Sequence, residues 1–129
     1  MDDDLRVVLQ VTRHAHKQLK KEKITSKELE LIKNNCISMF RGVPSANVHK
    51  LKLPQFNRVG IETTFYIVRL GLKARAIVSV DYDDLFEQLL ITVYGYTKNH
   101  NIDKMISNIT ESFYQQNKFL EENGGRYAD

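Results

Sequence analysis

The sequence has few of the residues that build disulfide scaffolds or flexible linkers. It contains one cysteine, Cys36, which excludes an internal disulfide framework and is typical of a protein in a reducing cytoplasm. Two prolines and six glycines are too few for a long flexible linker between domains. The 129 residues are enough for one core, so we expect a single domain over residues 1–129.

Long apolar runs and a basic N-terminus are also missing. No apolar run approaches the roughly 20 residues that a membrane-spanning helix needs. The first residues are acidic, whereas a secretory signal begins with basic residues, so we expect a cytoplasmic location. What is present, 42% hydrophobic and 27% charged residues, is the balance of a globular domain.

The charge of the chain is unevenly distributed. The net charge is +3, but residues 41–75 hold seven basic residues and one acidic residue. That segment carries a net +6, and the rest of the chain therefore carries −3. Such asymmetry indicates a polyanionic partner on one face, although lysines at exposed turns also serve solubility.

Strand-like segments dominate the second half of the chain. Thr63–Leu70, Ala74–Tyr82 and Leu89–Thr97 are rich in β-branched and aromatic residues, and the gaps between them suit antiparallel hairpins. Alternating apolar residues predict another strand over Leu5–Thr12, which has to pair with one of these later strands. Val48–Leu53 also alternates and is either a short strand or an extended approach to the sheet.

Helical spacing of apolar residues predicts three helices. The first covers Arg13–Lys23, and the second starts at a capping box of Thr25 and Glu28 and ends near Arg41. The third is long and covers residues 101–123. We therefore predict an α+β fold in the order β-α-α-β-β-β-α, with a small, mostly antiparallel sheet. The helices would pack on one face and leave the other open for binding.

The sequence predicts no metal site and no cofactor. His14 and His16 are two residues apart on a helix and point away from each other, so they cannot chelate together. The acidic residues at 81–84 are usual in a turn. Cys36 lies in the apolar stripe of the second helix, which favours a buried small hydrophobe over a nucleophile.

The order of elements and several short motifs resemble the RelE/ParE superfamily of bacterial toxins. The HigB branch, which has a helix after the last strand, is nearest. The order of elements matches over nearly the whole chain, whereas only about residues 50–100 match in detail. The matching segments are Lys50–Lys52, Phe65–Arg69, Arg75–Asp81 and Ile91–His100.

The resemblance implies a toxin that cuts messenger RNA on the ribosome without a metal and that a cognate antitoxin holds inactive. Such cleavage uses the 2′-hydroxyl as nucleophile, so it needs a proton acceptor, a cation beside the phosphate and a donor for the leaving oxygen. Lysine and arginine supply the charge, and aromatic rings can stack on splayed bases.

The resemblance also implies roles for particular residues. Arg75 corresponds to the phosphate-binding arginine and Lys98 to the basic residue after the last strand. We predict His100 as the proton-transfer group because histidine titrates near neutral pH. Tyr96 completes the predicted catalytic set. The predicted RNA-binding set comprises Lys50, Lys52, Arg69, Lys73 and Tyr94.

Several alternatives stay open on the sequence alone. Lys50 and Lys52 also suit an exposed sheet edge that lysines protect from aggregation. Tyr94 and Tyr96, as same-face residues of one strand, suit packing as well as stacking. Arg69 either belongs to the site or pairs with Asp81 or Glu62. The alternative functions are a ParE-like inhibitor of DNA gyrase and a non-catalytic nucleic-acid- or protein-binding module.

Overall fold

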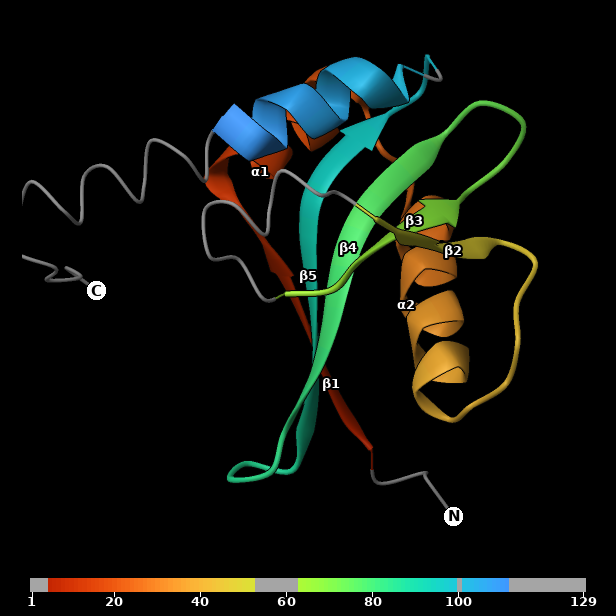
Figure 1. The fold of residues 1–129 in the computed structure, drawn as a ribbon, viewed down its shortest axis with the longest axis vertical. Helices are drawn as coiled ribbons and strands as arrows, with labels where there is room; N and C mark the ends of the chain where they lie inside the picture. The colour runs from red at the N-terminus through yellow and green to blue at the C-terminus, as the bar shows by residue number, and fades with distance from the viewer. Residues whose placement is uncertain (1–4, 53–62, 100, 112–129) are drawn as a thin grey trace, which may run out of the picture.

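The computed structural model describes residues 5–52, 63–99 and 101–111. It contains a five-stranded sheet in the order β1-β5-β4-β3-β2 (Figure 1). The strands are β1 (Arg6–Val11), β2 (Val48–Leu51), β3 (Phe65–Arg69), β4 (Arg75–Asp83) and β5 (Gln88–Thr97). The helices are α1 (Arg13–Glu22), α2 (Ser26–Phe40) and a C-terminal helix that begins at residue 102 and is described as far as residue 111. The rest of the predicted third helix, residues 112–123, lies outside the described residues. None of them is long and apolar enough to cross a membrane, as far as the described residues go.

The sheet is mixed but mostly antiparallel. β1 runs parallel to β5, and the pairs β5–β4, β4–β3 and β3–β2 are antiparallel. The predicted α+β class is confirmed, as is the expectation that the first strand pairs with a later one. The order differs from the prediction by one element, because Val48–Leu51 forms a complete edge strand, β2, hydrogen-bonded to β3.

Local side-chain chemistry explains where the first two helices start. The Thr12 hydroxyl accepts the backbone N–H of Ala15 at 3.1 Å and caps α1. At α2, the Thr25 hydroxyl accepts the N–H of Glu28 at 3.1 Å, and the Glu28 carboxylate accepts the N–H of Thr25 at 3.0 Å. This is the predicted capping box, with both of its hydrogen bonds present.

One face of the sheet packs against α1 and α2. α1 lies on β5, and α2 contacts β2 and β4. The buried helix residues are Ala15, Leu19, Ile32 and Cys36, and the buried strand residues include Val78, Leu89, Ile91 and Val93. Burial raises the pKa of the Cys36 thiol to about 12, so this side chain stays a neutral thiol and acts as a core hydrophobe.

The opposite face is not open, which corrects the prediction that all helices lie on one side. Met105 and Ile109 of the C-terminal helix pack there against Phe65 and Ile77. Figure 1 shows this helix (blue) and α1 on opposite sides of β5. The physical reason lies in β4, where Arg75–Ser79 is buried at every position, as expected for a strand covered on both faces.

An irregularity in β5 separates the two tyrosines that the sequence placed on one face. Ile77 pairs with Gly95, but the next residue, Val78, pairs with Val93, so Tyr94 is an extra residue in the ladder. Tyr94 packs on the side of the C-terminal helix, and Tyr96 is buried on the side of α1 and α2. The prediction that Tyr94 and Tyr96 share a face is therefore wrong, because it assumed an unbroken two-residue period.

Gly95 allows the C-terminal helix to approach the sheet, and its replacement tests that packing. A Cβ at Gly95 would lie 2.7 Å from Met105 Cγ and 2.8 Å from Met105 Sδ. We expect Gly95→Ala to lower the free energy of unfolding by about 1–3 kcal/mol through overpacking, measured by urea denaturation. The double variant Gly95→Ala/Met105→Ala should cost less than the sum of the single variants. Strict additivity would contradict the contact.

Candidate functional site

A pocket at one end of the sheet brings together lysines from three separate segments. It has a volume of about 460 Å³ and lies between the start of α2 and the turn that joins β3 to β4. We call it the lysine pocket. Its cationic residues are Lys27, Lys73 and Lys98, and its apolar lining includes Leu31, Leu70, Leu72 and Ala74. Two residues of the predicted site, Lys73 and Lys98, thus meet at one cavity.

Lys98 is held in place from two sides. Its ammonium donates to the backbone carbonyl of Lys23 at 3.0 Å and lies 4.0 Å from Glu28 Oε1. Lys23 caps the C-terminal end of α1, where the helix dipole favours a cation. Because the Lys98 side chain is still 37% exposed, its charge remains accessible to an anion in the pocket.

Tyr96 lies beneath the pocket rather than in it. Its hydroxyl donates to Glu28 Oε2 at 2.8 Å, and its residue is only 1% exposed. Burial raises the pKa of Tyr96, and the hydrogen bond to Glu28 and the negative charge of Glu28 raise it further. The neutral phenol therefore supports Glu28, and Tyr96 itself does not line the lysine pocket.

Glu28 connects the parts of this network. Burial alone would raise the pKa of its carboxyl, but the hydrogen bonds from Thr25 and Tyr96 and the charge of Lys98 outweigh burial and lower it. The carboxylate is therefore ionised near neutral pH. It belongs to the lining of the lysine pocket, where it offsets one of the three lysine charges.

Arg75, the residue most strongly predicted to bind phosphate, is 7% exposed and is engaged with the fold. Its Nη1 donates to the carbonyls of Gly71 and Ala74 at 2.9 and 2.8 Å, and its Nη2 donates to the carbonyl of Leu72 at 3.3 Å. Burial and the neighbouring charge of Arg69 lower the pKa of Arg75. Arg75 thus shapes the turn that carries Lys73 into the lysine pocket.

Arg69 occupies the same end of the sheet, but it is exposed. It pairs with Arg75 across β3 and β4. Asp81, its suggested partner, lies six residues further along β4 opposite Leu90, so that pairing is wrong. The other suggestion, Glu62, lies outside the described residues. Two arginines side by side repel each other, and an anion bound at this end would relieve the repulsion.

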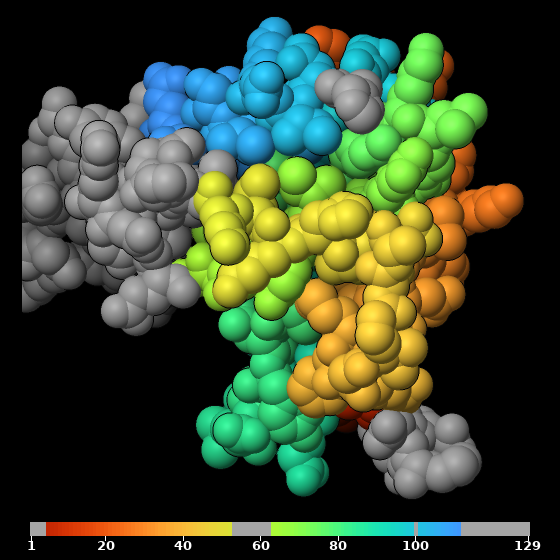
Figure 2. Space-filling model, turned by 45° about the vertical axis from the view of Figure 1, so that its right-hand side comes forward, coloured from red at the N-terminus to blue at the C-terminus, as the bar shows by residue number. Residues whose placement is uncertain are grey.

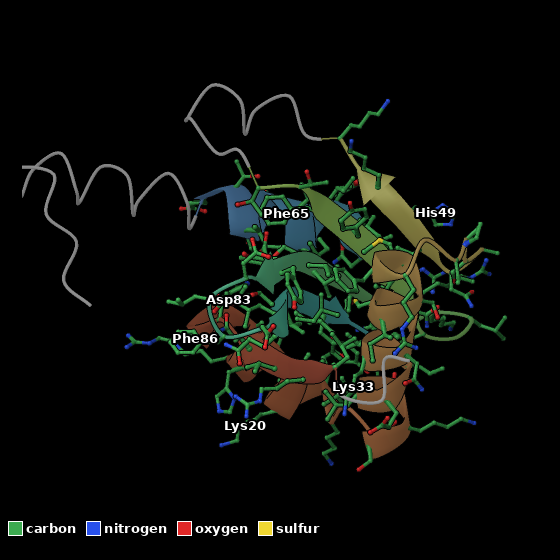
Figure 3. All side chains as sticks on the ribbon, turned by 90° about the horizontal axis from the view of Figure 1, so that it is seen from below. Lys20, Lys33, His49, Phe65, Asp83 and Phe86 are labelled. Atoms are coloured by element: carbon green, nitrogen blue, oxygen red, sulfur yellow. The ribbon has the colours of Figure 1, made fainter. Side chains whose placement is uncertain are left out.

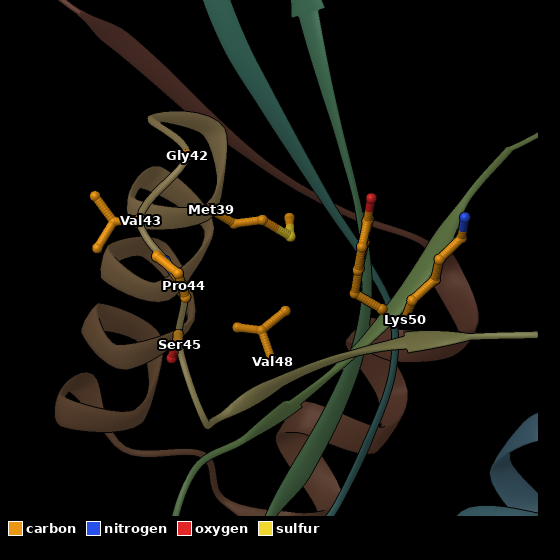
Figure 4. A pocket seen from close by; sticks show the side chains of 8 residues that line it. Met39, Gly42, Val43, Pro44, Ser45, Val48 and Lys50 are labelled. Atoms are coloured by element: carbon orange, nitrogen blue, oxygen red, sulfur yellow. The ribbon is translucent and has the colours of Figure 1, made fainter.

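The remaining predicted residues are not brought to the lysine pocket. Lys50 lines a second pocket of about 330 Å³, across from Met39 at the end of α2 (Figure 4). Lys52 is exposed just beyond β2. Tyr94 contacts Phe65 edge-on, with ring centroids 4.9 Å apart, and accepts a hydrogen bond from Ser79 Oγ at 3.2 Å. His100 lies outside the described residues.

Sequence reasoning missed the contribution of α2 to this site. The capping box predicts that α2 starts near Thr25 and therefore places Lys27 and Glu28 in its first turn. That local signal does not reveal that Tyr96 and Lys98 lie beside this turn, because they follow some 70 positions later in the chain. Only the packing of α2 against the sheet brings them together.

The described residues contain no group of three or more His, Cys, Asp or Glu side chains that could hold a metal ion.

Comparisons with protein-family models, characterised proteins and solved structures find no match for the chain. Three ammonium groups, one carboxylate and an apolar floor suit a ligand with anionic groups and an apolar body.

The role of Arg75 in shaping the β3–β4 turn can be tested by comparing the two neighbouring arginines. Arg75→Met would leave three turn carbonyls without their charged donor, so we expect the free energy of unfolding to fall by about 2–3 kcal/mol. Arg69→Met, at an exposed position, should change it by no more than about 0.5 kcal/mol. Urea denaturation monitored by circular dichroism measures both, and equal effects would contradict the assignment.

The Glu28 network predicts a specific loss of stability in acid. The pKa of Glu28 in the folded chain lies below its ordinary value of 4.5. Ionised Glu28 therefore stabilises the fold fully above pH 4.5, and this contribution is lost as the pH falls below 4.5 through the folded-state value. Urea unfolding between pH 7 and pH 3 measures this effect. The Glu28→Gln variant should be less stable than the unaltered chain at pH 7, and its free energy of unfolding should fall less than that of the unaltered chain between pH 7 and pH 3.

The matched control for that experiment is Glu30→Gln, which alters an exposed carboxylate on the same helix. It should reproduce the stability profile of the unaltered chain. If Glu28→Gln and Glu30→Gln gave the same profile, the hydrogen bonds of Glu28 would not stabilise the fold.

Proposed function

We propose that this chain is the toxin of a toxin–antitoxin pair, a ribosome-dependent endoribonuclease that contacts RNA at the lysine-pocket end of the sheet. The main support is that one cavity is lined by Lys27, Lys73 and Lys98. The sequence had predicted Lys73 as an RNA-contacting residue and Lys98 as a catalytic residue. Exposed Arg69 lies at the same end. The resemblance of residues 50–100 to RelE/ParE toxins supplies the reaction class.

The chemistry divides between groups that bind the substrate and groups that shape the site. Lys73 and Lys98 would contact phosphate oxygens and stabilise the charge that develops during attack by the 2′-hydroxyl. Leu72, which is 88% exposed in the same turn, offers an apolar surface to a base or a ribose. Arg75 and Tyr96 would act indirectly, by positioning Lys73 and Lys98 respectively.

Proton transfer is assigned to His100, which follows Lys98 by two residues in the sequence. Lys50 and Lys52, on the edge strand and just beyond it, would form a separate contact to RNA or to the ribosome. A cognate antitoxin would neutralise the toxin by covering the lysine-pocket end.

Expression in a bacterial host tests this function directly. We expect growth arrest with shortening of translated messenger RNAs, seen on Northern blots. Lys73→Glu/Lys98→Glu should restore growth and leave the transcripts intact, because it reverses the charge that would hold the phosphate. Lys20→Glu is the matched control, since Lys20 is exposed on α1 and does not line the lysine pocket, and it should stay toxic.

His100→Ala separates binding from cleavage. It should abolish cleavage while the purified protein still binds RNA, whereas loss of binding would argue against a proton-transfer role. Intact transcripts together with supercoiling defects would assign the chain to gyrase inhibition instead. Normal growth together with retained RNA binding would assign it to a non-catalytic module.

A further inference from the structure

The β4–β5 hairpin ends in an exposed apolar tip. The hairpin projects beyond the other elements of the described chain (Figures 1 and 2), and Figure 3 shows Phe86 at the outer edge of the molecule. Leu85 is 82% exposed and Phe86 is 63% exposed. These two adjacent apolar side chains form a small exposed patch that is available to a partner.

The tip is held in one shape before any partner binds. Asp83 Oδ1 accepts the N–H groups of Leu85 and Phe86 at 3.0 and 3.3 Å, and Asp83 Oδ2 accepts the side-chain amide of Gln88 at 3.4 Å. Just before the turn, Tyr82 near the end of β4 stacks on Phe40 of α2 with ring centroids 5.4 Å apart. A preformed surface loses little conformational freedom on binding.

The charges around the tip restrict what can bind there. Asp81, Asp84 and Glu87 are exposed on the same hairpin, and Asp83 adds a fourth negative charge. The neighbouring strand contributes Arg6, which pairs with Gln88. The surroundings of Leu85 and Phe86 are therefore strongly acidic, so a complementary partner surface has an apolar floor and a cationic rim.

The chain itself carries such a surface in the lysine pocket. Lys27, Lys73 and Lys98 against Glu28 leave this pocket with a net positive charge, and Leu31, Leu70 and Leu72 provide an apolar lining. The pocket and the tip lie at opposite ends of β4, which is nine residues long and spans roughly 30 Å. The tip therefore cannot reach the pocket of its own molecule.

We propose that the hairpin tip of one copy docks into the lysine pocket of a second copy, head to tail. Leu85 and Phe86 enter the pocket between Leu31 and Leu72, and the acidic residues of the tip face Lys27 and Lys73. Since the proposed function places RNA in this pocket, the docked tip competes with RNA, and self-association restrains the enzyme.

The geometry determines how this assembly behaves. The two contact surfaces differ, so the interface is heterologous and can extend into chains or close into rings. A hairpin tip covers less area than a stable dimer interface, so the association is weak and depends on concentration. Because charges face each other near solvent, raising the salt concentration weakens it.

Mixing two complementary variants tests the proposal. The tip variant is Leu85→Ser/Phe86→Ser, and the pocket variant is Lys27→Glu/Lys73→Glu. In sedimentation velocity at low salt, the unaltered chain should form species that grow with concentration, and each variant alone should stay monomeric. Mixed in equal amounts, the two variants should form a dimer and nothing larger, because only one intact contact remains.

Further variants control for folding and for non-specific charge effects. Both double variants alter exposed side chains, so circular dichroism should match that of the unaltered chain. Lys20→Glu, away from both surfaces, should self-associate normally. Adding Asp81→Lys, Asp84→Lys and Glu87→Lys to the Lys27→Glu/Lys73→Glu variant should restore association, because the tip then carries a net positive charge and the pocket a net negative one.

Two outcomes would overturn the proposal. One is an unaltered chain that stays monomeric at every concentration. The tip would then bind a different partner with a basic surface. The other is a tip variant that self-associates normally. Adding a short RNA to the assembly is a separate test. If the assembly forms as described but the RNA does not dissociate it, the docking of the tip stands and the proposed RNA-binding function is contradicted.

Discussion

The carboxylate of Glu28 is the interaction on which the candidate site depends. It accepts hydrogen bonds from Thr25 at the start of α2 and from Tyr96 near the end of β5, and it lies beside the ammonium of Lys98. One side chain therefore caps a helix, attaches that helix to the sheet and orients a cation. Without it, the lysine pocket would lose the link between its helix wall and its strand wall.

The irregularity in β5 lets neighbouring residues of this strand serve both faces of the sheet: Tyr94 packs with the C-terminal helix, and Tyr96 still reaches Glu28 on the side of α2. The extra residue, Tyr94, remains on the side of the C-terminal helix, and Gly95 leaves room for Met105. Tyr96 then turns to the opposite side, where its hydroxyl reaches Glu28 and its N–H donates to Gln18 of α1 at 3.0 Å. Both faces are covered where β4 is buried at every position, from Arg75 to Ser79, and the lysine pocket lies beyond that part, at the end of the sheet.

The two ends of β4 are opposite in character. The end at Arg75 is cationic, with Arg69 and the lysine pocket beside it, and the end at Asp83 is acidic and carries Leu85 and Phe86. This polarity underlies both proposals. A cationic cavity suits the phosphates of RNA, and the same charge and apolar lining suit the acidic tip of another copy.

The sequence by itself determined the elements whose signals are local. The capping box at Thr25 and Glu28 and the β-branched runs each require only neighbouring residues, and α1, α2, β1, β3, β4 and β5 formed close to where they were predicted. For β2, the sequence had left a strand and an extended segment both open. It also identified Lys73 and Lys98 as cations of interest. Tertiary structure alone decided that Arg75 is buried against turn carbonyls, that Tyr94 and Tyr96 face apart, and that Lys27 joins the site. These outcomes depend on which side chains are buried and on the extra residue in the pairing of β5 with β4. Both are set by contacts between residues far apart in the sequence.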